Sequence, residues 1–407
     1  MRKKVLFVAT ITRHIEGFHT PLLKLFKEKG WEVQVATGDK KKISKYCDKK
    51  YTIPIERSPY KLKNLKAIKE LKKIIDKENY DIIHCHTPMG SVVARLAARH
   101  ARKNGTRVIY TAHGFHFFKG APLINWLLFY PVEKYLAKYT DTLITINKED
   151  YELAKSKFSG KCKDIEYVPG VGIDTKKFDV SMSEKEKLEL REKVGLKNND
   201  YILTCVARLD KNKNQEFLIN AMQKIVIMNN NIHLLLVGPD ELNGKYKKKV
   251  KKYKLENNIH FVGKIADIKV LSSIYAICDL FFFPSTYDTY SIAVREACIM
   301  ETPSLLTIGS SAAEAFTNDV NGFLANGDVC SMEKRILEIF SDDAHRIEVG
   351  KVAAKTIPIT FDTMVDRTLE RYRYLIAKRK ESEGKKKRTV RKAPQRRVKK
   401  QEKKKEA

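Results

Sequence analysis

Residues 4–37 of the chain read KVLFVATITRHIEGFHTPLLKLFKEKGWEVQVAT, and their hydrophobic pattern sets the expected architecture. Lys4–Thr10 and Trp31–Thr37 are short apolar runs rich in β-branched residues, which is typical of buried strands. Between them, Thr20–Gly30 has the apolar spacing of an amphipathic helix and ends at a glycine. A strand, a helix and a strand in this order form a β-α-β unit with parallel strands and a right-handed crossover.

The same alternation fills most of the remaining chain. Tyr80–His86, Thr106–His113 and Thr140–Asn147 are further predicted strands, separated by helical segments. After a polar helix, the alternation restarts at Tyr201 and runs to Ser285. Strands that alternate with helices imply an α/β fold, here with two Rossmann-like doubly wound domains. We expect the domains to face a cleft lined by the carboxyl ends of both sheets, where two substrates can meet.

Size and composition agree with a two-domain cytoplasmic protein. A chain of 407 residues with 43% hydrophobic content exceeds the size at which single cores usually split. No stretch approaches the ~20 apolar residues of a membrane span, and the first apolar run is too short for a signal peptide. The seven cysteines are odd in number and form no C-x-x-C pair, so we predict core thiols rather than disulfides or a zinc site.

The net charge of +30 is unevenly distributed, because residues 378–407 contain 16 Lys and Arg residues, 4 Glu residues and no aromatic residue. A segment of this composition cannot bury enough apolar surface to fold alone, so we predict a disordered basic tail. The lack of stacking aromatics argues against a base-reading nucleic-acid module. An anionic membrane surface would instead hold the protein peripherally on the inner face of the cell membrane. A solvated tail without a specific partner is the third possibility.

The segment PSTYDTYSIAVREACIMETPSLL, Pro284–Leu306, places two carboxylates across a predicted loop-to-helix junction. Asp288 lies in the loop after an apolar strand, and Glu296 lies in the following helix. Loops at the carboxyl ends of parallel strands bind ligands in open α/β proteins, and a helix start attracts phosphate groups. The arrangement is therefore typical of a sugar-nucleotide site. The alternative is that Asp288 only caps the loop and that Glu296 is an exposed helix charge.

Three further polar residues are predicted at the same rim. Arg208 follows the strand Tyr201–Ala207 and Lys213 lies in the next loop, where two cations suit a diphosphate. Alternatively, both are ordinary surface charges. His113 ends another strand, where it could contact a hydroxyl or phosphate, or could cap the strand by bonding to the backbone.

Phe115–Pro131, FHFFKGAPLINWLLFYP, is apolar and aromatic but is interrupted by Lys119, Gly120, Pro122 and Asn125. This interruption argues against a membrane span. The segment fits an interfacial patch or a lipid-facing acceptor groove, and it fits a buried packing helix equally well.

The chain contains no D-x-D among its aspartates, no H-E-x-x-H and no P-loop lysine motif. Without these motifs the sequence does not indicate a metal-bridged diphosphate, and we expect neither a metal nor another cofactor. The cations of the protein itself would then have to neutralise the leaving group.

Several of these segments together closely resemble a known family. They are YTAHGFHFFKGAPLINWLLFYPVEKYL, VPGVGIDTKKF, VARLDKNKN, FVG, and the P-S pair that precedes Asp288 together with the E-A pair at Glu296. From Lys4 to about Lys378, the chain is similar to family 4 glycosyltransferases of the GT-B type. It looks most like bacterial enzymes that assemble capsular or exopolysaccharide units on polyprenyl-diphosphate lipids.

The resemblance implies roles for the candidate residues at the donor. Arg208 and Lys213 would bind the donor diphosphate, with help from the backbone around Tyr290 and Ser291. Glu296 would hold the ribose hydroxyls.

The same resemblance places the sugar and the base. Asp288 and His113 would contact the transferred sugar, and Val262 and Gly263 would face the base. Gly17 matches a phosphate-binding glycine region, although Glu16 stands where the family has a second glycine. Asp288 stands where the family usually has Glu, and its shorter side chain bears on which sugar hydroxyls are read.

The resemblance also implies a domain plan. Residues 1–180 would form an acceptor-binding domain and residues 181–356 a nucleotide-sugar-binding domain. A helix at residues 357–377 would return to the first domain, and residues 378–407 would form the basic tail.

The implied function is a retaining, metal-independent transfer of a sugar from a nucleoside diphosphate donor, UDP-linked, to a lipid-linked saccharide acceptor. Cell-surface polysaccharide biosynthesis is the implied process. Other possible activities are glycolipid formation from diacylglycerol and epimerisation of a nucleotide sugar. A non-catalytic protein that binds membrane or nucleic acid is the alternative from a different class.

Overall fold

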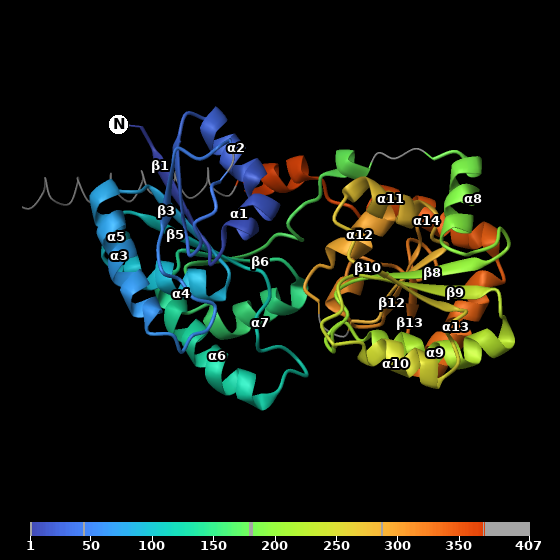
Figure 1. Cartoon of the computed structure of the whole chain (residues 1–407). Helices are drawn as coiled ribbons and strands as arrows, with labels where there is room; N and C mark the ends of the chain where they lie inside the picture. The colour runs from blue at the N-terminus through green and yellow to red at the C-terminus, as the bar shows by residue number, and fades with distance from the viewer. Residues whose placement is uncertain (1, 44, 179–181, 286–287, 369, 371–407) are drawn as a thin grey trace, which may run out of the picture.

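The computed structural model describes residues 2–43, 45–178, 182–285, 288–368 and 370. These residues form two α/β domains that lie side by side, each with one parallel sheet between layers of helices (Figure 1). The predicted fold of two Rossmann-like parallel sheets is confirmed. Predictions for residues 378–407 lie outside the described residues.

The N-terminal sheet has seven strands in the order β3-β2-β1-β4-β5-β6-β7. The strands are β1 (Lys4–Val8), β2 (Glu32–Thr37), β3 (Lys49–Thr52), β4 (Ile82–His86), β5 (Arg107–Ala112), β6 (Thr142–Thr145) and β7 (Asp164–Tyr167). The helices of this domain are α1 (Thr12–Phe18), α2 (Thr20–Glu28), α3 (Lys63–Glu78), α4 (Pro88–Ala97), α5 (Arg99–Lys103), α6 (Leu123–Leu136) and α7 (Lys148–Phe158). Short 3₁₀ turns follow at Ala137–Tyr139 and Thr175–Phe178.

The C-terminal sheet has six strands in the order β10-β9-β8-β11-β12-β13. The strands are β8 (Tyr201–Val206), β9 (Ile232–Val237), β10 (Ile259–Gly263), β11 (Leu280–Phe283), β12 (Ser304–Thr307) and β13 (Phe323–Ala325). The helices of this domain are α8 (Glu184–Lys193), α9 (Gln215–Met228), α10 (Lys245–Lys252), α11 (Ile268–Ala276), α12 (Ile292–Ile299), α13 (Val329–Phe340) and α14 (Asp343–Thr356), and a 3₁₀ turn spans Ser311–Ala313.

Both sheets reverse their winding direction at one point. In the N-terminal sheet β1 pairs with both β2 and β4, and in the C-terminal sheet β8 pairs with both β9 and β11. The connections on the two sides of such a point leave the sheet in opposite directions, which opens a crevice at the carboxyl ends of the central strands. The two crevices therefore lie beside the ends of β1 and β4 and of β8 and β11.

Four strands, β3, β7, β12 and β13, were not expected from the sequence. β3 and β7 are the edges of the N-terminal sheet, and their residues are exposed or half-buried. Short polar edge strands carry little hydrophobic alternation, because one side of each lacks a neighbouring strand. Their pairing depends on the neighbouring strand rather than on their own sequence.

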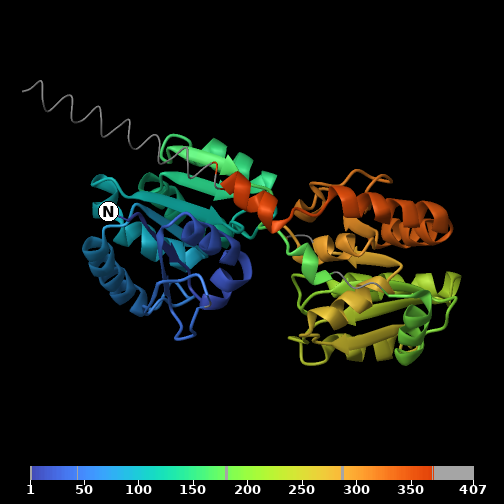
Figure 2. The same ribbon diagram turned by 90° about the horizontal axis from the view of Figure 1, so that it is seen from above.

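The last described segment returns to the N-terminal domain. Residues 361–368 are helical, and Met364 and Val365 are buried in the core around β1 and β2. The Ile173 N–H donates to the Ile359 carbonyl at 2.9 Å, and the Phe361 N–H donates to the Ile173 carbonyl at 3.1 Å. Figure 2 shows this segment crossing from the C-terminal domain to the side of the N-terminal sheet.

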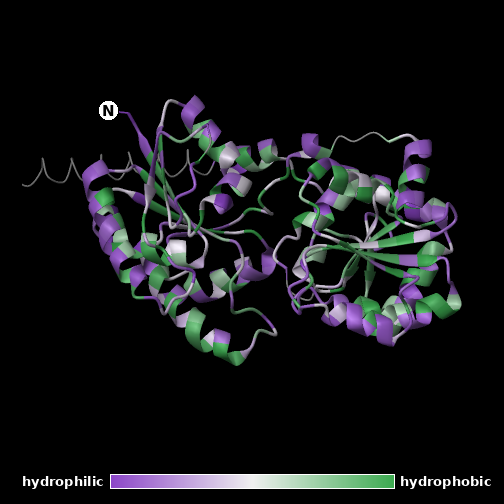
Figure 3. Cartoon of the chain, in the orientation of Figure 1, coloured by the Kyte–Doolittle hydropathy of each residue, from purple (hydrophilic) through white to green (hydrophobic). Residues whose placement is uncertain are grey.

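Helix α6 resolves the alternatives for the apolar segment around it. Trp126, Phe129 and Tyr130 pack against the N-terminal core, whereas Leu123 and Leu127 are 80% and 71% exposed. One side of the helix is thus a packing surface and the other is an exposed apolar surface. The ribbon of α6 is largely green, or hydrophobic, in Figure 3. Throughout the part of the chain that the structure describes, no helix is both long enough and apolar enough to cross a membrane.

The seven cysteines are all free, and five of them are buried. Cys47 is only half-buried and Cys330 is exposed, so the prediction of a core thiol is wrong for Cys330. Cys330 is the second residue of α13, whose buried residues begin at Met332.

Candidate active site

A pocket of about 650 Å³ lies between the two domains. From the N-terminal domain it is lined by the loop after β5 and the start of α6, and from the C-terminal domain by the loops after β8 and β11. The lining residues include His113, Arg208, Lys213 and Asp288, which the sequence places 175 positions apart at the extremes. The structure therefore brings four of the predicted site residues together.

The domains are also joined directly beside this pocket. The Thr289 hydroxyl donates to the His113 carbonyl at 2.9 Å. The Glu314 carboxylate accepts from the Lys148 N–H at 2.9 and 3.0 Å, at the start of α7. A carboxylate is favourable there because the first N–H groups of a helix lack partners within it.

Lys213 and Asp288 form an ion pair inside the pocket. Asp288 also accepts the Ser291 N–H at 3.0 Å, just before α12 begins at Ile292. The proposed loop cap is therefore real, but Asp288 combines it with a partly buried charge contact. This pairing holds a carboxylate and an ammonium group next to the N-terminus of α12.

Arg208 is paired with acids as well. Its guanidinium contacts Glu241 at 2.9 and 3.1 Å and Asp210 at 3.1 Å, and its side chain is half exposed. The main chain is held because Gln215 donates to the Arg208 carbonyl at 2.7 Å. A diphosphate entering the pocket would compete with these carboxylates for the N–H groups of Arg208.

Glu296 is not an exposed helix charge. It is the fifth residue of α12 and accepts a hydrogen bond from the Tyr275 hydroxyl at 3.0 Å. Burial raises the pKa of the Glu296 carboxyl above its ordinary value, and the Tyr275 bond partly opposes this. Glu296 does not line the interdomain pocket itself.

Tyr290 and Ser291 form the turn into α12. The buried Tyr290 ring packs closely over Gly170, where the ring would clash with any Cβ, and the Arg295 guanidinium lies 4.5 Å from the ring centroid. Ser291 has a left-handed backbone with φ of 43°, and Asp288 already accepts its N–H. The proposed backbone donor at Ser291 is therefore engaged within the loop.

Like Tyr290, Ser291 and Glu296, the three remaining predicted residues do not line the pocket. Gly17 lies inside α1 beside open space, rather than in a phosphate-binding loop. Val262 and Gly263 end the edge strand β10, where Val262 is 37% exposed and the Gly263 carbonyl accepts the Gly238 N–H at 2.8 Å.

A second pocket of about 640 Å³ opens within the N-terminal domain. It lies between the ends of β1, β4 and β5, the loop around Tyr60 and the helix α6, and most of its lining is apolar. Gly114, Phe115 and His116 line both this pocket and the interdomain pocket. The two pockets therefore meet at the loop that carries His113.

An ion pair anchors the helix that walls this second pocket. Arg95 of α4 is 1% exposed and donates to both carboxylate oxygens of Glu133 on α6, at 2.8 and 3.1 Å. Arg95 also lies 4.2 Å from the centroid of the Tyr110 ring. The packing face of α6 is thus fixed by charge as well as by apolar contact.

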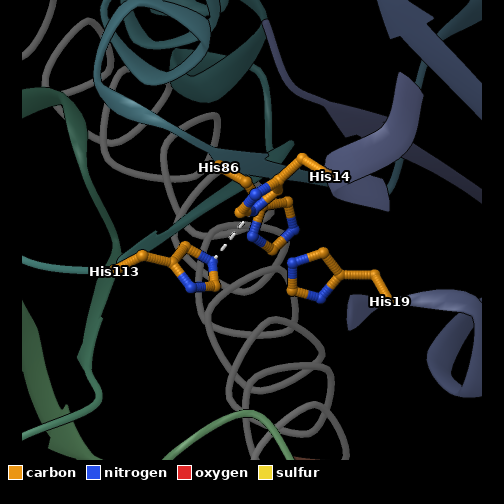
Figure 4. A group of neighbouring side chains, drawn as sticks. All are labelled: His14, His19, His86 and His113. Carbon is orange, nitrogen blue, oxygen red and sulfur yellow. Dashed lines mark hydrogen bonds between the residues drawn. The ribbon is translucent and has the colours of Figure 1, made fainter. Parts of the chain in front are cut away.

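The structure reveals three histidines that the sequence did not single out. His14, His19 and His86 converge with His113, and one ring nitrogen from each of the four side chains lies within 4.8 Å of the other three (Figure 4). His14 and His113 approach to 3.2 Å between their Nε2 atoms. The residues come from three separate segments, so no local spacing marks the cluster.

The comparisons with known proteins agree with this geometry. The family models "Glycosyl transferase 4-like" and "Glycosyl transferases group 1" match residues 4–147 and 186–356. EpsD of Bacillus subtilis (strain 168), which bears a glycosyltransferase name, is 41% identical over 359 residues, or 88% of this chain and 92% of EpsD.

The chain belongs to the group 1 glycosyltransferases. The family recognised from the sequence motifs is thus confirmed, and the protein is an enzyme of this class. An Escherichia coli relative named "UDP-Gal:alpha-D-GlcNAc-diphosphoundecaprenol alpha-1,3-galactosyltransferase" is 29% identical over 287 residues, or 69% of this glycosyltransferase and 72% of the relative.

Solved structures show the same GT-B fold. Anabaena HepE, in complex with UDP and glucose, matches this glycosyltransferase with a TM-score of 0.73 and 19% identity, covering 92% of this chain and all of HepE. Sucrose-phosphate synthase from Thermosynechococcus elongatus matches with a TM-score of 0.74 and 18% identity, again over 92% and 100%. Because the sequence identities are this low, these two structures show a shared fold and nothing more specific.

Proposed function

We propose that this glycosyltransferase transfers a sugar, with retention of configuration and without a metal or cofactor, from a UDP-sugar to a lipid-linked saccharide in cell-surface polysaccharide biosynthesis. One observation carries the proposal. The interdomain pocket combines two cations, Arg208 and Lys213, with His113 and Asp288, and it continues into an apolar pocket at Gly114. A charged donor and an apolar acceptor can therefore meet at one loop.

In this proposal, the donor diphosphate lies against the C-terminal wall. As the glycosidic bond breaks, negative charge develops on the leaving diphosphate, and Arg208 and Lys213 stabilise it. The phosphates would replace Glu241 and Asp288 as partners of these cations. The choice of UDP is supported by the structure of HepE with UDP and by the UDP-Gal name of the E. coli relative.

The sugar would lie between Asp288 and His113, where the walls of the pocket meet. The Asp288 carboxylate accepts the Ser291 N–H, a contact that donor binding leaves in place, which favours a positioning role over covalent attack on the sugar. We therefore propose that the acceptor hydroxyl attacks from the face that the diphosphate leaves, with the leaving phosphate accepting its proton. Trapping a glycosyl adduct on Asp288 would overturn this mechanism.

The acceptor would use the apolar pocket and the exposed side of α6. Leu123, Ile124 and Leu127 are 80%, 56% and 71% exposed, and Leu128 and Val132 lead from them into the pocket lining. Apolar side chains in such a row suit a lipid chain or the surface of a bilayer. The diphosphoundecaprenol in the name of the E. coli relative supports a prenyl-diphosphate acceptor.

Peripheral contact with an anionic membrane is part of this proposal. Lys134 is exposed in the last turn of α6, the helix of the apolar row, and Lys138 is exposed in the 3₁₀ turn that follows. Basic residues beside an inserted apolar surface add roughly 1 kcal/mol each near anionic lipids. The basic residues 378–407 would add to this attraction.

The test uses the full chain with a panel of UDP-, GDP- and ADP-sugars and three acceptors: a polyprenyl-diphosphate saccharide, diacylglycerol and water. A matching donor at 100 times its dissociation constant should stabilise the protein by about 2.7 kcal/mol. We expect turnover with the prenyl-linked acceptor, an unchanged anomeric configuration by NMR and full activity in EDTA. Transfer only to diacylglycerol, inversion of the anomer or loss of activity in EDTA would each contradict the corresponding part of the proposal.

A further inference from the structure

The histidine cluster of the N-terminal domain contains buried polar groups without hydrogen bonds. His19 and His86 are 4% and 0% exposed, and neither of their rings has a hydrogen-bond partner among the described residues. A buried polar group left unpaired costs roughly 1–3 kcal/mol. Four unpaired ring nitrogens in one place call for an occupant that satisfies them.

The geometry of the cluster suits a metal ion. Figure 4 shows the four rings of His14, His19, His86 and His113 turned toward a common centre. Around a tetrahedral zinc ion with Zn–N bonds of ~2.0–2.1 Å, ligand nitrogens lie ~3.3–3.4 Å apart. His14 and His113 are already at 3.2 Å, and all four rings offer nitrogens within 4.8 Å. The His19 and His86 rings are stacked, so they have to turn about their soft terminal torsions to close the remaining gaps.

The scaffold positions the four rings independently. His14 lies in α1, His19 is the residue between α1 and α2, His86 ends β4, and His113 follows β5. His86 lies in β4 and His113 is the first residue after its paired neighbour β5, so the sheet fixes one ligand and the backbone that leads into the other. Sites built on such rigid elements hold ligand geometry better than sites on loops.

The protonation state favours metal binding as well. Burial lowers the pKa of His14 to about 4, and holds the pKa values of His19, His86 and His113 well below the ordinary value. The imidazoles are therefore neutral near pH 7, and only the neutral ring ligates a metal.

We propose that His14, His19, His86 and His113 form a binding site for a divalent transition-metal ion, with Zn²⁺ as the preferred ion. A site of four imidazoles suits Zn²⁺, Cu²⁺ and Ni²⁺, whereas Mg²⁺ and Mn²⁺ prefer oxygen ligands. A consequence follows if the proposed function holds. His113 would be withdrawn from the sugar when it ligates the metal, so the ion would inhibit transfer rather than support it.

The test measures metal binding directly, on the untagged full chain after treatment with a chelator. Titration with Co²⁺ should give the visible absorption of a tetrahedral site, saturating at one ion per chain, and Zn²⁺ should displace it. This readout needs no sugar donor. A failure of the proposed glycosyl transfer would therefore leave the metal assignment intact, and the reverse also holds.

His86→Phe and His19→Phe test the ligands, because phenylalanine keeps a flat ring in the stack but supplies no nitrogen. His19 and His86 are stacked with ring centroids 3.7 Å apart. Each variant should weaken Co²⁺ binding by ~100-fold or more, beyond the 10–100-fold typical of losing an outer-shell partner. The matched control is His233→Phe in the C-terminal domain, where His233 contacts His260 at 3.2 Å, and it should bind Co²⁺ unchanged.

Two results would overturn the proposal. One is the absence of saturable tetrahedral Co²⁺ binding by the wild-type chain. The other is unchanged binding in whichever of the two cluster variants is folded by circular dichroism. As a second readout, Zn²⁺ should inhibit transfer by the wild-type enzyme, and EDTA should reverse the inhibition.

Discussion

The two walls of the interdomain pocket differ in charge: one carries paired cations, and the other carries a histidine that is uncharged. On the C-terminal wall, Arg208 and Lys213 are held by carboxylates. On the N-terminal wall, His113 lies among imidazoles that burial keeps neutral, next to a largely apolar pocket. A wall of paired cations can exchange its carboxylates for phosphates. The N-terminal wall, whose one charged lining residue among those the structure describes is Lys119, suits a sugar and an apolar acceptor. The comparison places the donor diphosphate against the C-terminal domain and the sugar and acceptor against the N-terminal domain.

The largest expected effect concerns the cations of the C-terminal wall. Lys213→Ala should lower kcat/KM for the UDP-sugar by about 10³-fold, because the substitution removes a preorganised charge that stabilises the leaving diphosphate. Arg208→Ala should act in the same direction. Steady-state kinetics with varied donor measures the loss, and Lys211→Ala, an exposed lysine of the same loop, is the matched control. Unchanged kinetics in both variants would break the assignment of charge to this wall.

Asp288 tests where the two walls meet. Asp288→Asn keeps an oxygen that can accept the Ser291 N–H but removes the charge that pairs with Lys213. We expect kcat to fall by about 10²-fold, as for a misplaced substrate, while the Kd for UDP measured by calorimetry changes little. Asp288→Glu, which restores the charge, should recover part of the activity. Equal losses in kcat and UDP affinity would move Asp288 from the sugar to the diphosphate.

Much of the C-terminal wall was predictable because its signals are local. A strand that ends in a charged loop, as at Arg208 and Lys213, marks the carboxyl edge of a parallel sheet, and the order of strands then brings the loops together. The acid in the loop before α12 was found in the same way. The sequence did not reveal that Glu241 pairs with Arg208 and that Asp288 pairs with Lys213, because these two acids come from other loops.

The N-terminal wall was less predictable for a physical reason. His14 lies inside α1, His19 follows that helix and His86 ends β4. Only folding therefore brings the two histidines near α1 next to His86 and His113. The two histidines of the H-C-H run, His84 and His86, end one strand and are the sole local hint. The sequence of α6 also did not reveal its two faces. Both faces are apolar, so only the position of the helix against the sheet shows which one packs and which one is exposed.

A buried acid of the N-terminal domain gives a prediction about stability. Asp150 accepts from the Phe115 N–H and from Asn147, and burial raises its pKa to about 7. The folded protein thus holds a proton that the unfolded chain releases near pH 4, so stability falls as pH rises from about 4 to about 7. Asp150→Asn keeps the acceptor oxygen and removes the ionisation.

We expect Asp150→Asn to raise the free energy of unfolding at pH 8 by about 2 kcal/mol, and to have little effect at pH 4. Urea unfolding at both pH values measures the difference. Glu152→Gln, an exposed acid on the same helix, should change neither value. A loss of stability at pH 8 would mean that the Asp150 charge itself supports the loop after β5, and that this part of the N-terminal wall is charged after all.

The smallest expected effect lies at the rim of the apolar pocket and sharpens the acceptor half of the comparison. Leu127→Ser removes an apolar side chain that is 71% exposed on α6. Contact with a lipid would bury this side chain, which is worth about 1.5 kcal/mol, so KM for a long-chain prenyl-linked acceptor should rise about tenfold. KM for a short-chain, soluble acceptor analogue and for the UDP-sugar should stay the same. Ile227→Ser, an 83% exposed residue on α9 of the other domain, is the matched control and should leave all three values unchanged. If Leu127→Ser instead raised KM for both acceptors equally, this face would contact the saccharide, and the lipid chain would have to bind elsewhere.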